Sequence, residues 1–173
     1  MDEETIVIRE AVKNDAPGML EFLNRIGTES DFLTFQSGEE LHLTVSKLEK
    51  SIETSANRKN ALYLIAERDG KIIGNLKLSG GSKARIEHTG EFGLSILQAY
   101  GGKGIGTKML AALIEWSKAT RIIRKINLRV RSDNEKALHL YKKFGFVQEG
   151  VLRRDFLIDG VFYDSIAMGL LID

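Results

Sequence analysis

LSILQAYGGKGIGTKMLAAL, residues 94–113, joins an apolar strand to an amphipathic helix through a loop with four glycines in six residues. Glycines leave main-chain N–H groups unscreened by side chains, and a helix begins with the positive end of its dipole. Several such donors at one helix N-terminus are suited to holding a phosphate or pyrophosphate group. The junction therefore predicts an anion site.

Two common phosphate loops do not fit this stretch. A mononucleotide P-loop requires Gly, four residues, Gly-Lys and then Ser or Thr, whereas Gly102-Lys103 is followed by Gly104. A dinucleotide-binding fingerprint that starts at Gly102 requires Gly or Ala where Thr107 stands. It also requires an acidic residue about 20 positions further on, where the chain reads ATRIIRKINLRV. The loop belongs to neither class.

Composition limits the class of protein. The 173 residues are 43% hydrophobic and 28% charged, which predicts one compact α/β domain over residues 1–173. A net charge of +1 gives no global field that would recruit nucleic acid or an anionic membrane. The absence of cysteine excludes disulfides, thiolate zinc sites and a cysteine nucleophile. Three scattered histidines without ligand spacing predict no metal site.

The N-terminus, MDEETIVIRE, is acidic and lacks a hydrophobic stretch of signal-peptide length. No apolar run approaches the ~20 residues of a membrane span. We therefore expect a cytoplasmic protein that does not insert into a membrane.

Hydrophobic periodicity and turn signals predict strands that alternate with helices and end in a hairpin. Asp-Gly pairs mark two hairpin turns, at Asp69-Gly70 and at Asp159-Gly160. The expected strands are 5–9, 61–67, 71–78, 91–97, 125–131 and a C-terminal hairpin that starts at 146, and the expected helices are 15–26, 37–55, 105–116 and 135–144. This order indicates a mixed sheet with helices on both faces.

Local signals predict how several helices begin, end and pack. Two capping boxes, Ser37 with Glu40 and Ser132 with Glu135, are expected to begin helices. Gly145 is expected to end the last helix in a left-handed conformation. The helix after the glycine loop carries one apolar stripe, which predicts that it packs on a sheet: Ile105, Met109, Ala112, Leu113 and Trp116.

The glycine loop resembles the acyl-CoA pyrophosphate loop of the GNAT superfamily of N-acetyltransferases. That signature is Arg or Gln, two residues, Gly, one residue, and Gly or Ala, which maps onto Gly101, Gly104 and Gly106. The first position departs from it, since Gly101 lacks the usual side chain. The main-chain donors remain, so the resemblance implies that coenzyme A is bound by the loop residues Gly101, Gly102, Lys103, Gly104, Ile105, Gly106 and Thr107.

A second stretch, NEKALHLYKKFGF, resembles the next GNAT motif through Asn134, Ala137, Leu140, Tyr141, Lys143, Gly145 and Phe146. Asn134 and Tyr141 are seven residues apart, which is two helical turns, so both point the same way. The resemblance implies that Asn134 contacts the pantetheine arm and that Tyr141 protonates the departing thiolate. A phenol with a pKa near 10 is a suitable acid for a thiolate, whereas a carboxylate has lost its proton at neutral pH.

The acceptor amine is protonated at pH 7 and needs a route for its proton to leave. Glu91 lies on the non-apolar face of the strand that leads into the glycine loop, where many GNAT enzymes place a carboxylate that accepts this proton. The alternative interpretation is a solvated carboxylate at a strand start. Glu87 and His88 are weaker candidates. Four other carboxylates are candidates for steering a cationic amine or are simply solvated: Glu29, Asp31, Glu149 and Asp155.

In GNAT proteins the strand before the loop parts from its parallel neighbour, here the strand 125–131, and pantetheine fills the gap. The resemblance implies that a main-chain N–H of Ile96 or Leu97 polarises the thioester carbonyl. Gly93 is expected to mark a bulge that helps to open this gap. On strand 125–131, Arg129 and Arg131 are expected on a solvated face. A nucleic-acid site over residues 121–131 is disfavoured by the net charge.

We predict a single-domain α/β GNAT fold with a mixed, mostly antiparallel sheet. The predicted function is an acetyl-CoA-dependent N-acetyltransferase that passes the acetyl group directly to a primary amine of a small molecule or a peptide N-terminus. The C-terminal part, from Glu149-Gly150 onward, resembles the ribosomal-protein N-terminal and polyamine acetyltransferase branches. The alternative is a non-catalytic acyl-CoA-binding or regulatory module with the same fold. The sequence leaves a homodimer open.

Overall fold

A computed structural model describes residues 5–30, 32–33 and 42–173. Short 3-10 turns at Lys13–Asp15 and Gln98–Tyr100 precede α1 and the glycine loop. The helices are α1 Ala16–Glu29, α2 Val45–Ala56, α3 Ile105–Thr120 and α4 Glu135–Lys143, and the strands are β1 Val7–Glu10, β2 Ala61–Arg68, β3 Lys71–Gly80, β4 Thr89–Ile96, β5 Lys125–Arg131, β6 Val147–Ile158 and β7 Val161–Leu171.

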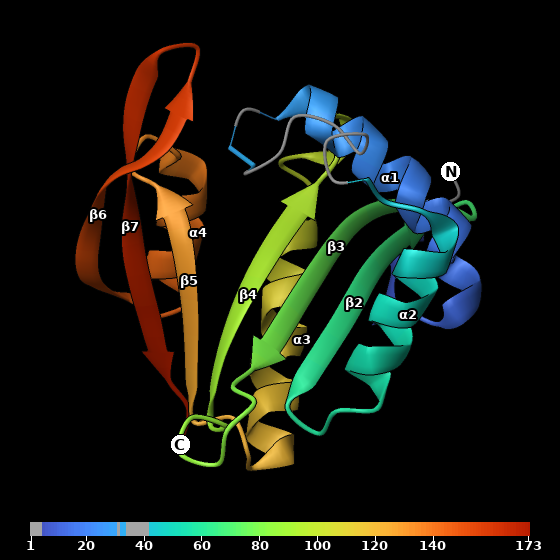
Figure 1. The fold of residues 1–173 in the computed structure, drawn as a ribbon, viewed down its shortest axis with the longest axis horizontal. Helices are drawn as coiled ribbons and strands as arrows, with labels where there is room; N and C mark the ends of the chain where they lie inside the picture. The colour runs from blue at the N-terminus through green and yellow to red at the C-terminus, as the bar shows by residue number, and fades with distance from the viewer. Residues whose placement is uncertain (1–4, 31, 34–41) are drawn as a thin grey trace.

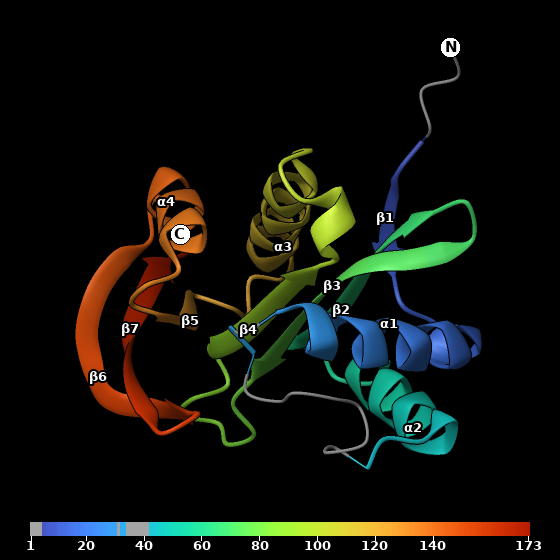
Figure 2. The same cartoon turned by 90° about the horizontal axis from the view of Figure 1, so that it is seen from above.

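The strands form one seven-stranded sheet in the order β1-β2-β3-β4-β5-β7-β6. Every neighbouring pair is antiparallel except β4 with β5, which is parallel. Helices α1 and α2 cover one face of the sheet, and α3 and α4 cover the other (Figures 1 and 2). The expected mixed sheet with helices on both faces is confirmed.

The strands β4 and β5 pair over a short stretch and then diverge (Figure 1). Their pairs are Thr89 with Lys125, Gly90 with Ile126 and Glu91 with Asn127, although β4 continues to Ile96 and β5 to Arg131. The parting expected from the GNAT resemblance is therefore present, and it lies at the end of β4 that leads into the glycine loop.

Gly93 does not form the expected bulge. The register between β3 and β4 is unbroken from the pair Gly74 and Ile96 to the pair Gly80 and Gly90, and Gly93 lies opposite Lys77 within it. The two strands of the parallel pair thus diverge without an extra residue in β4.

Both predicted Asp-Gly turns are confirmed. Asp69 and Gly70 have φ of 51° and 75°, and Asp159 and Gly160 have φ of 49° and 78°. Positive φ at both central residues is the conformation of a two-residue hairpin loop whose twist matches that of its strands.

The helix starts differ in part from the predictions. Asn134 rather than Ser132 caps α4, since its side-chain oxygen accepts a hydrogen bond from the Ala137 N–H at 3.3 Å. Helix α2 begins after Thr44, whose hydroxyl accepts from the Lys47 N–H at 3.1 Å. The predicted capping box of residues 37 and 40 lies outside the described residues. Gly145 ends α4 with a φ of 92°, as expected.

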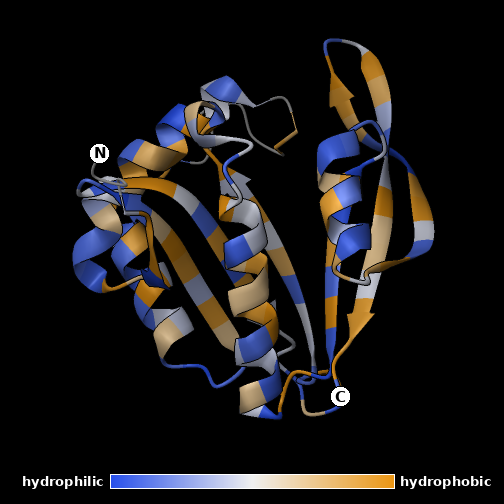
Figure 3. Cartoon of the chain, turned by 180° about the vertical axis from the view of Figure 1, so that it is seen from behind, coloured by the Kyte–Doolittle hydropathy of each residue, from blue (hydrophilic) through white to orange (hydrophobic). Residues whose placement is uncertain are grey.

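Helix α3 packs against the sheet through one buried face, and hydrophobic and hydrophilic residues alternate along it in Figure 3. The buried residues are Ile105, Met109, Leu110, Leu113 and Ser117. Ala112 and Trp116, expected in the stripe, are half-buried beside it. The helix is thereby fixed with its first turn at the end of β4.

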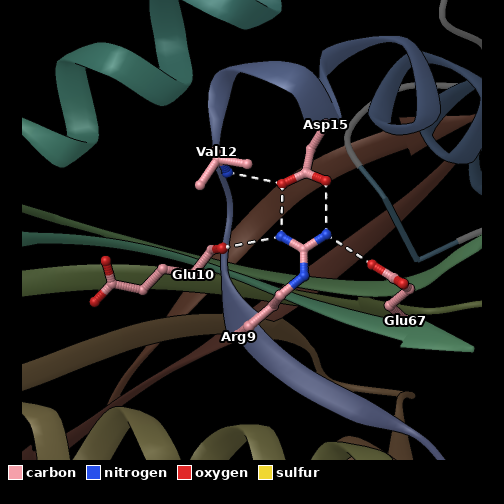
Figure 4. A network of polar contacts seen from close by, with 5 residues as sticks. All are labelled: Arg9, Glu10, Val12, Asp15 and Glu67. Carbon is pink, nitrogen blue, oxygen red and sulfur yellow. Dashed lines mark hydrogen bonds and ion pairs between the residues drawn. The ribbon is translucent and has the colours of Figure 1, made fainter. Parts of the chain in front are cut away.

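A polar network joins β1 to the start of α1 and to β2 (Figure 4). The Arg9 guanidinium donates two hydrogen bonds of 2.8 Å to the Asp15 carboxylate and one of 2.6 Å to Glu67. It also donates to the Glu10 carbonyl, and the Val12 N–H donates to Asp15 at 2.7 Å. The hydrogen bonds from Arg9 lower the pKa of the Asp15 carboxyl.

The substitution Asp15→Asn is expected to lower the free energy of unfolding by about 1 to 2 kcal/mol at pH 7, because it removes a charge-assisted pair. The lowered pKa means that this stabilisation is present above the ordinary value of 3.8 and is lost as the pH falls through the folded value. Urea unfolding of both proteins at several pH values is the measurement. The exposed Glu115→Gln is the control, and a difference that persists in acid would contradict the account.

Candidate active site

A cavity of about 560 Å³ lies where β4 and β5 part. It brings together four residues singled out in the sequence, Glu91, Ile96, Asn134 and Tyr141. The remaining walls come from the end of α1 and the residues after it, from β4, β5 and α4, and from β6: Ile26, Ser30, Phe32, Leu33, Phe92, Gly93, Leu94, Ser95, Arg129, Val130, Arg131, Ala137, Asp155 and Phe156. The glycine loop is not part of these walls and follows the end of β4.

The glycines of the loop have two physical roles. Gly102 and Gly104 have φ of 73° and 77°, and a Cβ at either would meet open space, so the backbone conformation alone favours glycine there. A Cβ at Gly106 would lie 3.4 Å from the side chains of Ile96 and Leu140, which is van der Waals contact, so the first turn of α3 packs against β4 and α4 with room for little more than a methyl group. The loop is therefore tightly curved and open outward.

The N–H groups from Gly102 to Thr107 have no protein acceptor in the part of the chain that the structure describes. The first N–H to find one is that of Lys108, which donates to the Gly104 carbonyl at 3.1 Å. The first turn of α3 carries no acidic side chain that would compete for these donors. Six N–H groups at the N-terminus of a 16-residue helix fit a pyrophosphate.

Two cations lie beside the loop. The Lys103 Nζ is 5.6 Å and the Arg68 Cζ is 5.5 Å from the centroid of the Tyr100 ring. Two positively charged groups are thus present near Gly101, which itself has no side chain. Arg68 could not be predicted as a neighbour of the loop from the sequence, because it belongs to a hairpin more than thirty positions upstream.

Tyr141 is 7% exposed and packs edge-on against Phe92 and Phe146, with both centroid distances at 5.8 Å. Burial raises the pKa of the Tyr141 phenol to about 12. Its hydroxyl has no hydrogen-bond partner among the described residues. Among the described residues, Ser165 Oγ is the only side-chain nitrogen or oxygen atom that is both fully buried and without a hydrogen-bond partner. The Tyr141 hydroxyl is therefore not fully buried, and it is open to the cavity that the residue lines.

Asn134 has a structural task in addition to its predicted one. Its side-chain oxygen caps α4, which leaves the side-chain NH₂ as a donor, and the residue lines the cavity. The cap fixes the side chain at the start of the helix that carries Tyr141.

Of the two main-chain N–H groups expected at the parting, that of Leu97 is already bonded within the sheet and that of Ile96 is not. The Leu97 N–H donates to the Ile73 carbonyl at 2.9 Å on the β3 side. Successive N–H groups along a strand point in opposite directions, so that of Ile96 points toward the side from which β5 has parted. Leu97 itself is buried in the core.

Glu91 lies on the cavity wall with its side chain 56% exposed, and its carboxylate is 3.5 Å from the Arg129 Nε. Of the other carboxylates considered, Asp155 lines the cavity and Glu149 pairs with Lys125 at 2.8 Å. Glu29 accepts hydrogen bonds from the Arg25 side chain and from the Gln98 N–H, both at 2.9 Å. Glu29 therefore ties α1 to the segment before the glycine loop. Asp31 lies outside the described residues.

Arg131 was expected on a solvated face, and this expectation is wrong. Its side chain is 5% exposed, lies 3.9 Å from the centroid of Tyr163, and donates two hydrogen bonds to Asp133. Arg129 and Arg131 both line the cavity. The alternation of polar and apolar residues in β5 is the same for a cavity wall and a solvated face, so the sequence did not distinguish the two.

No group of metal-ligating side chains and no helix able to cross a membrane occurs within residues 5–30, 32–33 and 42–173.

The comparisons agree with this geometry. The model of the Acetyltransferase (GNAT) family matches residues 28–146, and the chain belongs to that family. A crystal structure of the GNAT-family acetyltransferase from Streptococcus pneumoniae is 36% identical, with a TM-score of 0.93 over 98% of this chain and 100% of that one. The spermidine N(1)-acetyltransferase of Escherichia coli (strain K12) is 30% identical over 78% of this chain and 69% of its own. The L-amino acid N-acetyltransferase AaaT of the same strain is 28% identical over 67% and 72%.

The raised pKa of Tyr141 predicts that its phenol ionises near pH 12, about two units above an exposed tyrosine. The measurement is the absorbance of phenolate in alkaline titrations of the wild type and of Tyr141→Phe. The difference between the two titrations should have its midpoint near pH 12 while the protein is folded. A midpoint near pH 10 would contradict the burial of this side chain.

Proposed function

We propose that this protein transfers the acetyl group of acetyl-CoA directly to a primary amine, with Tyr141 as the acid and Glu91 as the base. The observation that carries the proposal is the cavity at the parting of β4 and β5, which both side chains line, together with the six unpaired N–H groups of the loop that follows β4. The absence of cysteine supports direct transfer, since no thiol nucleophile is available.

Binding is assigned to main-chain groups and to two side chains. The N–H groups of Gly102 to Thr107 hold the pyrophosphate, and Lys103 adds a positive charge. The NH₂ of Asn134 and the edge of β4 left unpaired by β5 hold the pantetheine arm. When bound, acetyl-CoA supplies an acetyl group activated as a thioester.

Three groups then act on the reaction. The Ile96 N–H polarises the thioester carbonyl, and Glu91 accepts the proton that the acceptor ammonium must lose. A carbon–nitrogen bond forms, the carbon–sulfur bond breaks, and Tyr141 donates its proton to the departing sulfur. The second proton that the nitrogen loses on becoming an amide then replaces the proton that Tyr141 gave. The Tyr141 phenol, with a pKa raised by burial to about 12, is protonated at neutral pH, and the same burial raises the proton affinity of a thiolate beside it.

Three properties stay predictions from the sequence: a cytoplasmic location, one domain over residues 1–173, and no binding of nucleic acid. The acceptor is assigned here only as a small-molecule or peptide amine, and a homodimer is left open.

Tyr141→Phe is expected to lower turnover by at least about tenfold, the low side of a general-acid contribution, while acetyl-CoA still binds. Release of the coenzyme A thiol measures turnover, and calorimetry measures binding. Tyr63→Phe is the control, because Tyr63 is also buried but lies outside the cavity. Unchanged turnover in a chemistry-limited assay would reject the role of Tyr141. Binding of acetyl-CoA without thiol release for any amine would indicate a non-catalytic module instead.

Glu91→Gln is expected to shift the pH dependence of turnover to higher pH. Without the carboxylate the amine must lose its proton to solvent. The fraction of neutral amine in solution increases as the pH rises toward the amine pKa near 10. Rates of thiol release from pH 6 to 10 test this, with the exposed Glu87→Gln as the control. An identical profile for wild type and Glu91→Gln would leave Glu91 with a structural role only.

A further inference from the structure

Glu91 and Arg129 form a pair of opposite charges on the wall of the cavity. They come from β4 and β5 at the point where the two strands cease to pair, and the carboxylate lies 3.5 Å from the Arg129 Nε. Their side chains are 56% and 58% exposed. Exposed ion pairs add little to stability, so a ligand that offers each group a new partner separates them at small cost.

We propose that the acceptor is an α-amino acid bound as its zwitterion, with its ammonium on Glu91 and its carboxylate on Arg129. This inference rests on the proposed acetyl transfer. In an α-amino acid both charged groups are attached to one carbon, so they match two adjacent protein groups of opposite charge. The same contact places the amine on the group assigned as its base.

The charges of the cavity wall discriminate against a polyamine. Within the described lining, the carboxylates are Glu91 and Asp155 and the cations are Arg129 and Arg131. Arg131 is engaged by Asp133 at 2.7 Å, whereas the partner of Arg129 is Glu91 itself. A polyamine carries no anion for the Arg129 guanidinium, so once its ammonium occupies Glu91 the guanidinium of Arg129 is left without a partner. A peptide N-terminus lacks the α-carboxylate and leaves the guanidinium of Arg129 facing a neutral amide.

The remaining walls indicate what side chain the amino acid carries. Ile26, Phe32, Leu33 and Phe156 surround the cavity on the side of α1 and β6, and the Phe32 side chain is 41% exposed. Apolar walls of this kind favour an apolar or aromatic side chain, because its transfer from water is favourable. L-phenylalanine is therefore a suitable probe.

The test compares L-phenylalanine with 2-phenylethylamine, which has the same ring and amine and lacks the carboxylate. Spermidine and an N-terminal peptide complete the set, and thiol release from acetyl-CoA gives kcat/KM for each. L-phenylalanine is expected to exceed 2-phenylethylamine by at least about tenfold, the effect of one charge-assisted pair.

Arg129→Gln is expected to reduce the preference for L-phenylalanine over 2-phenylethylamine by at least about tenfold. The readout is the ratio of kcat/KM for L-phenylalanine to kcat/KM for 2-phenylethylamine. The two amines differ in basicity, but this difference affects the ratio equally for wild type and variant. Arg124→Gln is the matched control: Arg124 precedes the same strand, contacts the Ile172 carbonyl and Asp173, and lies outside the cavity. It should leave the ratio unchanged.

Equal or better use of spermidine, the peptide or 2-phenylethylamine would overturn the inference and leave the proposed acetyl transfer standing. An unchanged ratio in Arg129→Gln would also overturn it. Absence of thiol release with every amine, from a folded protein that binds acetyl-CoA, would overturn the inference and the proposed function together.

Discussion

The strands β4 and β5 share three residue pairs and then part, and the rest of the site depends on that divergence. The N–H and C=O groups of an interior sheet strand normally form hydrogen bonds with both neighbouring strands. Here the part of β4 after Glu91 is hydrogen-bonded to β3 alone. The Ile96 N–H, which points away from β3, is therefore left unpaired within the sheet. The same divergence opens the cavity whose walls include Glu91 on β4 and Tyr141 on α4.

The second constraint is the sharp turn from β4 into α3. Positive φ at Gly102 and Gly104 bends the chain between β4 and α3, and the first turn of α3 at Gly106 packs against Ile96 of β4. The six N–H groups of the loop have no acceptor in the described protein, so an anion that accepts from them breaks no hydrogen bond within the protein. Glu29 fixes the segment between strand and loop by accepting from the Gln98 N–H. The anion site and the cavity are thus held by the same strand.

Features encoded by neighbouring residues could be predicted, and features created by packing could not. The Asp69-Gly70 turn follows from local backbone preferences, and the motif residue Tyr141 lies on the cavity wall as the resemblance implied. The prediction of a bulge at Gly93 was wrong, because a glycine in a strand permits a bulge without requiring one. The direction of the Leu97 N–H depends on the register with β3. The prediction that Arg131 is solvated was wrong because its burial comes from aromatic rings far away in the sequence, that of Tyr163 among them.

The central claim is that main-chain N–H groups of β4 and of the glycine loop bind acetyl-CoA, and amide hydrogen exchange followed by NMR tests it most directly. The Leu97 amide, bonded to Ile73, should be protected with or without acetyl-CoA. The amides of Ile96 and of Gly102 to Thr107 should exchange rapidly alone and slowly once acetyl-CoA is bound. Unchanged exchange of these amides in the saturated complex would contradict the account.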